Sequence, residues 1–453
     1  MHLAISLLFL LFSGSLLAQD LLDSYTSAQL EKLGEARYRA GQLDLALPYY
    51  EKSLEKEPSR LSSLLNAGKI RESGFQAEQA VALFRRALVI DPKNPEALAG
   101  LSRSAPSLEE RHSALRELAS VATGAQGRVA RAQLQVLDAL SGRPAFQVAD
   151  PARPYSFQLE DAGRDVHPDM TFPVLRIVAP NGEKISLLVG TAHEGIWMLK
   201  RAARALGARF LFPTPYPWLD QGDLLAGDLA IIDTLEIGDL TLRNCPVFAR
   251  PASRSFMYGV DGVIGIDVFK DFLIDIDNAA AELRLTPFSD ANPAVVSKDF
   301  VAMRRHGPFL LAPVHLDAEY TGHFVLNSIA SDVFLQDGEP TKHAKEVSRG
   351  VTHPLSGWTC SASIPQRVFE VKLAAAAARW AGRATSCKMA DLNRAAGFRV
   401  SGVLGYSFLR GFSLVIDYRH GQIGFVPQAA RVPGARPSKQ HPDERWPVSP
   451  LSR

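Results

Sequence analysis

The spacing of apolar residues divides the chain into two parts with different periods. Between residues 27 and 104, apolar positions recur every three to four residues, which is typical of amphipathic helices. From residue 172 to residue 427, short apolar runs alternate with turns rich in Gly, Pro, Asp and Asn, which is typical of β-strands. We therefore expect a multidomain protein, with an α-helical part followed by an all-β part and a linker over residues 142–170.

A nearly continuous apolar segment opens the chain and ends in residues 13–18, SGSLLA. Small residues after a short apolar run predict a secretory signal peptide, residues 1–18, that is cleaved after Ala18. An uncleaved N-terminal anchor stays open as an alternative, because no Lys or Arg precedes Lys32. No later apolar run is long enough to predict another membrane span. The expected location is therefore outside the cytoplasm, either periplasmic or extracellular.

The helical part contains two copies of a repeat, offset by 34 residues. Both copies carry a glycine, an alanine, an aromatic residue and a proline in the same order. These residues are Gly34, Ala46, Tyr50 and Pro58 in the first copy and Gly68, Ala80, Phe84 and Pro92 in the second. The period is that of the tetratricopeptide (TPR) helix-turn-helix unit, to which the copies are similar.

We assign residues 19–141 to this TPR-like domain. Because such arrays need about three units to bury a continuous core, we expect residues 106–140 to form further helices that cap it. Two interpretations of the domain stay open. Its concave groove binds a peptide or protein partner, or the array is a packing platform for the domains that follow.

The β part repeats one plan twice, which predicts two lobes over residues 171–290 and 298–428. In each half an apolar strand leads into a short polar motif, and two apolar residues and a glycine follow much later. The motifs are Gly190-Thr191-Ala192 and Val263-Ile264-Gly265 in the first half, and Asn327-Ser328-Ile329 and Val403-Leu404-Gly405 in the second. Residues 429–453, with five prolines, predict a disordered tail.

Both lobes resemble the retropepsin-like aspartic peptidases, the family whose bilobal relatives include pepsin. In that family an apolar strand enters Asp-Thr/Ser-Gly, and an apolar pair with a glycine follows later. The resemblance implies a pepsin-like acid-protease fold with a peptide cleft between the lobes and a flap over it, for which residues 216–229 are the candidate. The residues that it places at the cleft are Gly190, Thr191, Ala192, Gly265, Asn327, Ser328 and Gly405.

The two residues that carry the family's chemistry are replaced. Its two aspartates share a proton and act as acid and base on a water molecule. Gly190 and Asn327 stand at those positions here, and neither side chain can take up a proton near neutral pH. No Asp-Thr-Gly or Asp-Ser-Gly occurs elsewhere in the chain. The sequence therefore predicts no intact catalytic residue and a pseudoenzyme that binds a peptide or protein partner without cleaving it.

Two other functions stay open. In the first, His193 and Glu194 with Asp332 substitute for the missing aspartates in an active endopeptidase, although we expect these three residues to be solvated in loops. In the second, the TPR-like domain is a scaffold or assembly factor and the β lobes are structural.

Charge and composition argue against a nucleic-acid-binding protein and against a metal or cofactor site. Lys and Arg total 50 against 48 Asp and Glu, and no dense basic stripe occurs, so we expect no nucleic-acid partner. The histidines form no HxH or HxxxH pair and the three cysteines form no CxxC pair, so we expect no metal and no cofactor. Cys245 and Cys387 are expected in buried strands, and Cys360 with Cys387 is the favoured pair if one disulfide forms.

Overall fold

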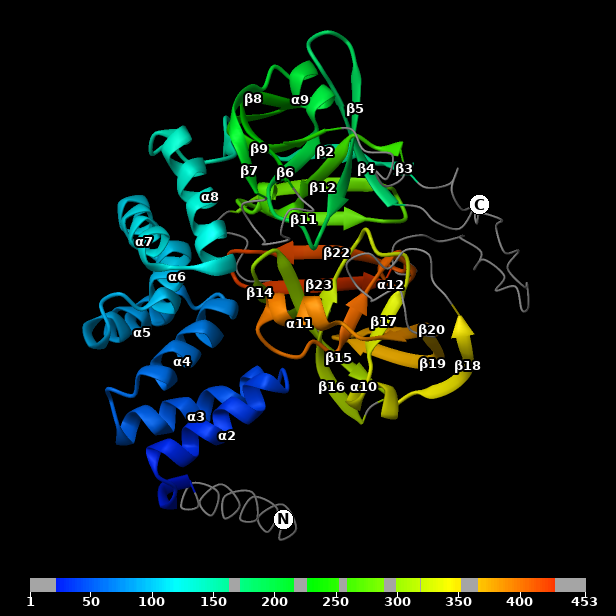
Figure 1. The fold of residues 1–453 in the computed structure, drawn as a ribbon. Coiled ribbons are helices and arrows are strands. Elements are labelled where there is room, and N and C mark those ends of the chain that lie inside the picture. The colour runs from blue at the N-terminus through cyan, green and yellow to red at the C-terminus, as the bar shows by residue number, and fades with distance from the viewer. Residues whose placement is uncertain are drawn as a thin grey trace, which may run out of the picture.

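A helical array precedes a large β region made of three sheets in the computed structural model (Figure 1). The predicted order, helical repeats followed by two β lobes, is confirmed. No helix within the described part of the chain is both long and apolar enough to cross a membrane. The predicted signal peptide and tail lie outside that part. The structure describes residues 22–162, 172–215, 226–251, 259–288, 299–317, 319–351 and 366–427.

The array begins at Ser27, where Thr26 caps the first helix by accepting a hydrogen bond from the Gln29 amide. Its helices are α2 (Ser27–Arg39), α3 (Leu43–Lys56), α4 (Leu61–Ser73), α5 (Ala77–Ile90), α6 (Pro95–Ser104), α7 (Leu108–Val121) and α8 (Gly124–Leu140). The repeat glycines allow adjacent helices to pack closely. A Cβ at Gly34 would lie 3.0 Å from the ring of Tyr50, and one at Gly68 only 2.7 Å from the ring of Phe84.

The two lobes follow one topology. The strand order β3-β4-β5-β10-β6-β9-β8-β7 in lobe 1 matches β14-β15-β16-β21-β17-β20-β19-β18 in lobe 2, strand for strand. Lobe 1 contains β1 (Gln147–Val148), β3 (Glu160–Ala162), β4 (Phe172–Val178), β5 (Lys184–Gly190), β6 (Ile196–Leu199), β7 (Arg209–Pro215), β8 (Ala226–Ile237), β9 (Leu240–Arg250) and β10 (Gly262–Gly265). Lobe 2 contains β14 (Arg304–His306), β15 (Phe309–Leu316), β16 (Tyr320–Leu326), β17 (Val333–Gln336), β18 (Lys345–Val351), β19 (Gln366–Ala375), β20 (Ala378–Cys387) and β21 (Gly402–Leu404). Short helices join these strands: α9 (Lys200–Ala205), η3 (Ile266–Phe269), α10 (Glu339–Lys342), α11 (Ala390–Ala396) and α12 (Tyr406–Leu409).

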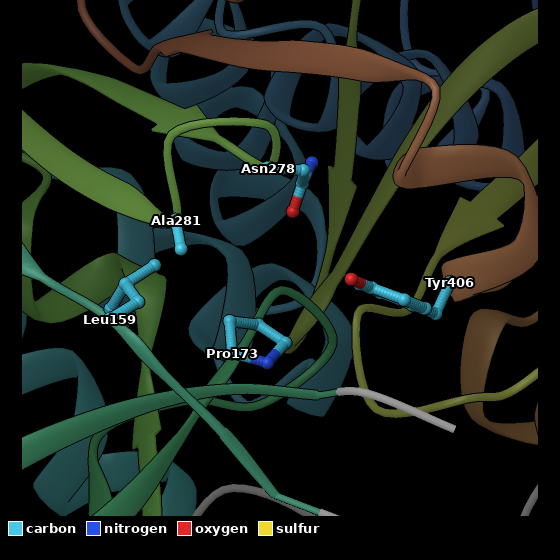
Figure 2. A pocket seen from close by; sticks show the side chains of 5 residues that line it. All are labelled: Leu159, Pro173, Asn278, Ala281 and Tyr406. Atoms are coloured by element: carbon cyan, nitrogen blue, oxygen red, sulfur yellow. The ribbon is translucent and has the colours of Figure 1, made fainter. Parts of the chain in front are cut away.

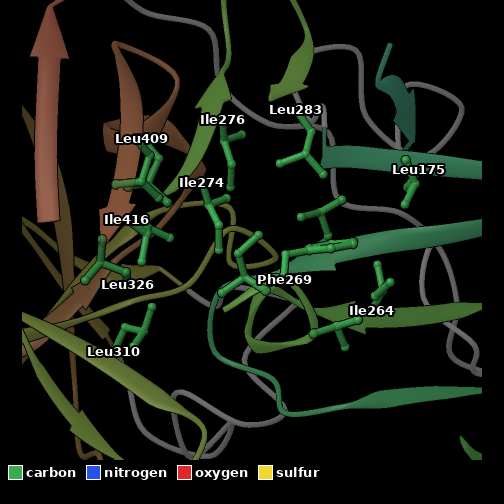
Figure 3. Close-up of a cluster of buried hydrophobic side chains, with 14 of the residues drawn as sticks. Leu175, Ile264, Phe269, Ile274, Ile276, Leu283, Leu310, Leu326, Leu409 and Ile416 are labelled. Atoms are coloured by element: carbon green, nitrogen blue, oxygen red, sulfur yellow. The ribbon is translucent and has the colours of Figure 1, made fainter. Parts of the chain in front are cut away.

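A third, six-stranded sheet joins the lobes within one chain. Lobe 1 provides β2 (Tyr155–Gln158), β11 (Phe272–Asp277) and β12 (Glu282–Pro287), and lobe 2 provides β13 (Phe300–Ala302), β22 (Phe412–Asp417) and β23 (Gln422–Pro427). At its centre β11 pairs with β22, with Ile274 opposite Ile416. Buried apolar side chains of both lobes form one continuous cluster around this pairing (Figure 3). Strand β2 comes from the stretch that was expected to be a linker.

The helical array is packed onto lobe 2 by the turns within its repeats. The α4–α5 turn carries Phe75 in a left-handed backbone conformation (φ 62°), and its ring contacts Tyr418 at 6.2 Å between ring centroids. One cluster of buried residues includes helix residues such as Tyr50 together with lobe 2 residues such as Phe309. This shared core supports the packing-platform interpretation of the array.

Arg304 of β14 adds polar contacts between lobe 2 and the helical array. Its guanidinium donates to the Ile70 carbonyl and to Ser73 Oγ, both at 3.2 Å, and pairs with Asp44. Only 11% of its side chain is exposed.

We expect Arg304→Ala to lower the free energy of unfolding by about 2 kcal/mol, because it leaves partly buried acceptors without their charged donor. Urea unfolding at neutral pH measures this loss. Arg394→Ala is the matched control, because Arg394 pairs with Asp391 while both side chains are largely exposed. Equal effects of the two substitutions would contradict this account of the helix–lobe junction.

Candidate functional site

The loops that follow β5 and β16 meet at the boundary between the lobes. Thr191 and Ser328 lie side by side there, both buried, and each hydroxyl binds the backbone of the opposite lobe. Thr191 Oγ1 accepts from the Ser328 amide at 2.9 Å and donates to the Leu326 carbonyl at 3.0 Å. Ser328 Oγ accepts from the Thr191 amide at 3.1 Å and donates to the Val189 carbonyl at 2.6 Å. We call these four reciprocal hydrogen bonds the Thr191–Ser328 clasp.

Parallel strand pairing brings each half of the sequence motif into this region. In lobe 1, β10 pairs with β5, so that Gly265 lies opposite Gly190; in lobe 2, β21 pairs with β16 and ends just before Gly405. A side chain on Gly265 would lie 2.5 Å from the His193 carbonyl, and one on Gly405 would overlap the Asp332 carbonyl. Glycine is therefore required at both positions by the close approach of the loops.

Gly190 and Asn327, at the positions where the retropepsin-like peptidases have aspartates, provide no carboxylate. A Cβ on Gly190 would lie 2.8 Å from Nδ1 of His193 and 2.9 Å from Cγ1 of Val263, so the imidazole occupies space next to this backbone. Asn327 is half-buried, and its Oδ1 accepts a hydrogen bond from the Ile329 amide at 3.1 Å. The structure thus places the predicted cleft residues at the lobe boundary, where all but Asn327 are buried.

The proposed substitutes for the aspartates differ from the expectation of solvated loop residues. His193 is half-buried and its ring stacks on Trp197 at 6.3 Å, and burial lowers the pKa of His193 to about 4. Glu194 accepts a hydrogen bond from Arg305 of lobe 2 at 2.6 Å and is 20% exposed. Asp332 is half-buried and accepts a hydrogen bond from the Ser331 hydroxyl.

Asp267 is a further carboxylate at this boundary that the sequence analysis did not single out. It accepts a hydrogen bond from the Gly195 amide at 3.0 Å, in the same loop as Glu194. Burial, and then the charge of Glu194, raise the pKa of Asp267 to about 6, while Arg305 opposes that shift. The available signal was its position two residues after Gly265, where lobe 2 has Ser407 after Gly405.

The candidate flap falls mostly outside the described residues. Ala226–Leu229 belong to β8, which pairs with β7 in a hairpin, and residues 216–225 are not described. Helix α8 lies against this hairpin, with Thr214 Oγ1 at 3.5 Å from Gln135. The helical array therefore contacts the base of the predicted flap.

A small pocket lies where lobe 1, the six-stranded sheet and lobe 2 meet (Figure 2). Its volume is about 10 Å³, and Tyr406 points into it opposite Leu159. Asn278 at its rim donates to the carbonyls of Leu409 and Phe412 and so joins the two lobes. The volume is below the range typical of small-molecule sites.

The cysteines and other candidate metal ligands contribute no site among the residues that the structure describes. Cys245 is a free, buried thiol, and burial raises its pKa to about 12. Cys387 is disulfide-bonded, and Cys360 lies outside the described residues. Within the described ranges, no group of three or more His, Cys, Asp or Glu side chains could hold a metal ion.

Comparisons with known proteins add little to this description. No family model matches the chain, and no curated protein does. The TPR domain of Arabidopsis OM64 is similar over 24% of this chain and 94% of that chain, with 19% identity and a TM-score of 0.23. The basic 7S globulin from soybean is similar over 61% of this chain and 95% of that chain, with 11% identity and a TM-score of 0.36. The strand order and register of the sheets therefore establish the fold.

The clasp should contribute measurably to stability. We expect Thr191→Val, which keeps the shape of the side chain, to lower the free energy of unfolding by about 2 kcal/mol, because the buried Ser328 amide loses its acceptor. Thr321→Val is the control, because Thr321 is exposed and bonds only His315 within the described contacts. Urea unfolding of the two variants measures the difference. If Thr191→Val lowers the free energy of unfolding no more than Thr321→Val does, the clasp does not stabilise the protein as proposed.

The pH dependence of stability should separate the two half-buried histidines, His193 and His306, from Asp267. The pKa values of His193 and His306 lie near 4 in the folded protein, below the usual 6.5, so the unfolded chain binds more protons and stability falls as pH drops from about 7 to 4. Asp267, with its pKa raised to about 6, acts in the opposite direction. We therefore expect Asp267→Asn to lose more stability than the wild type between pH 7 and pH 5 in urea unfolding. An equal loss in the variant and the wild type would show that Asp267 is ionised at both pH values and would contradict the raised pKa.

Proposed function

We propose that the chain is an exported, catalytically inactive, pepsin-like protein that binds a peptide or protein partner between its lobes. The observation that carries this proposal is the Thr191–Ser328 clasp. It holds the two lobes together beside the positions of the missing aspartates, while Gly190 and Asn327 occupy those positions. The hydrogen bonds that hold the lobes together are therefore present, whereas the two carboxylates that would activate a water molecule are absent from Gly190 and Asn327.

Activation of a water molecule needs a base and an acid on opposite sides of it. On the lobe 1 side the neighbouring group is His193, whose pKa of about 4 makes it a weak base near neutral pH. On the lobe 2 side Asn327 provides an amide, which does not exchange a proton in this range. Glu194 is held by Arg305 rather than left to act on a water.

Binding without cleavage is consistent with the β architecture that surrounds the clasp. An extended peptide is held by strand-like hydrogen bonds to backbone and by pockets for its alternate side chains. Each lobe sheet ends in an antiparallel hairpin, β7–β8 in lobe 1 and β18–β19 in lobe 2, whose edge strand can pair with an extended peptide. Export is inferred from the apolar segment of residues 1–18, and a near-neutral charge balance favours a peptide over a nucleic acid.

The test is equilibrium retention of a diverse synthetic peptide pool on immobilised protein comprising residues 19–453 at pH 7. We expect a subset of peptides that share a pattern of apolar residues to be retained. Glutamine-rich and glycine-rich members of the pool serve as the internal control. A protein that is folded by circular dichroism and retains no peptide would contradict the proposal.

One observation favours a second candidate, an endopeptidase that uses displaced carboxylates. Asp267 and Glu194 lie close enough for one charge to raise the pKa of the other, and such pairs are common in active sites. In that case Asp267→Asn would abolish peptide cleavage, whereas Asp271→Asn, which changes an exposed carboxylate nearby, would not.

A further inference from the structure

Strand correspondence gives each lobe an equivalent apolar face beside the clasp. Three residues from adjacent strands lie in register on each face, and none is more than 3% exposed. They are Val174, Leu188 and Val263 in lobe 1 and Leu311, Val325 and Val403 in lobe 2. Because side chains alternate along a strand, Leu188 faces the same side as Gly190. The face of lobe 1 therefore adjoins the position of the missing aspartate.

On lobe 2 this face is closed by other parts of the chain. Its residues belong to the buried cluster that also contains Leu392 of α11 and side chains of the helical array. The ring of Tyr38 meets that of Phe398 at 6.0 Å, and the Arg399 amide donates to the Arg39 carbonyl at 3.0 Å. The helical array is thus fixed over this half of the boundary.

On lobe 1 the equivalent face receives a side chain from the opposite lobe. Ile329 is 5% exposed and belongs to a buried cluster with Leu188 and Val263, separate from the main core. It follows Ser328 of the clasp directly, in a loop rather than a strand. Tyr406, also from lobe 2, borders the cluster and contacts Phe172 at 6.2 Å.

Each lobe inserts one loop residue into the apolar cluster of the other lobe, and the two inserted side chains differ in size. Ala192, two residues after Gly190, joins the lobe 2 cluster, and Ile329, two residues after Asn327, joins the lobe 1 cluster. The larger aliphatic side chain therefore enters the half that the helical array does not close. The lobe 1 cluster is separate from the main core of the lobes.

We propose that Ile329 is an intramolecular stopper, which fills the apolar face of lobe 1 and must withdraw before a peptide binds there. Because the face of lobe 1 is filled by the branched aliphatic side chain of Ile329, it accepts a side chain of that kind. The ligand is therefore an extended peptide that presents a branched aliphatic side chain to Leu188 and Val263. This inference rests on the proposed peptide-binding function, and it adds that the unliganded protein is closed and binds more weakly for that reason.

The test compares binding of two fluorescein-labelled pentapeptides, Gly-Gly-Leu-Gly-Gly and pentaglycine, to the full mature chain by fluorescence anisotropy. We expect Ile329→Ala to bind the leucine peptide at least tenfold more tightly than the wild type does, with no gain for pentaglycine. Ile329→Leu should stay close to the wild type, because it refills the face. Val347→Ala, at an exposed apolar residue of β18, is the matched control and should change nothing.

The outcomes separate the stopper from the proposed function. If wild type and Ile329→Ala bind the leucine peptide equally well, Ile329 is not a stopper and peptide binding stands. If neither binds the leucine peptide, the stopper fails, and retention of the diverse peptide pool decides separately whether the proposed function stands. Should Ile329→Ala not fold by near-ultraviolet circular dichroism, Ile329→Val replaces it. That variant lacks one methyl group, and an affinity no higher than that of the wild type would overturn the stopper.

Discussion

The Thr191–Ser328 clasp is the interaction on which the arrangement of the two lobes depends. Each hydroxyl both donates and accepts across the boundary, so that two backbone amides and two carbonyls of buried loops are satisfied at once. A buried amide or carbonyl without a partner is strongly destabilising. The clasp therefore fixes the sheets of the two lobes relative to each other, while among the described strands the lobes pair directly only through β11 and β22 of the third sheet.

This constraint does not need carboxylates. Two ionisable groups held next to each other in a desolvated boundary are unfavourable relative to neutral groups. Gly190 and Asn327 remove that repulsion, and the ring of His193 packs where a side chain on Gly190 would lie. At these two positions the lobe boundary thus has uncharged contacts, which is consistent with the proposed role in holding a partner.

Much of this architecture could be predicted from the sequence, because its signals are local. The 34-residue offset of Gly34 and Gly68 and the twofold motif around Gly265 and Gly405 reflect close approaches that only small residues permit. The placement of Thr191 and Ser328 at the cleft followed from a resemblance, but the hydrogen bonds between them did not. The ion pair of Glu194 with Arg305 and the insertion of Ile329 into lobe 1 join residues far apart in the chain. No periodicity or spacing in the sequence reports such contacts.

The most direct test of the central claim is a cleavage assay of the mature protein on a diverse peptide pool between pH 3 and pH 8, read by mass spectrometry. A clasp without carboxylates predicts that every peptide stays intact at every pH. Site-selective cleavage with an acidic optimum, copurifying with the folded protein and lost in Asp267→Asn, would contradict the account. It would show that displaced carboxylates restore the chemistry that Gly190 and Asn327 lack.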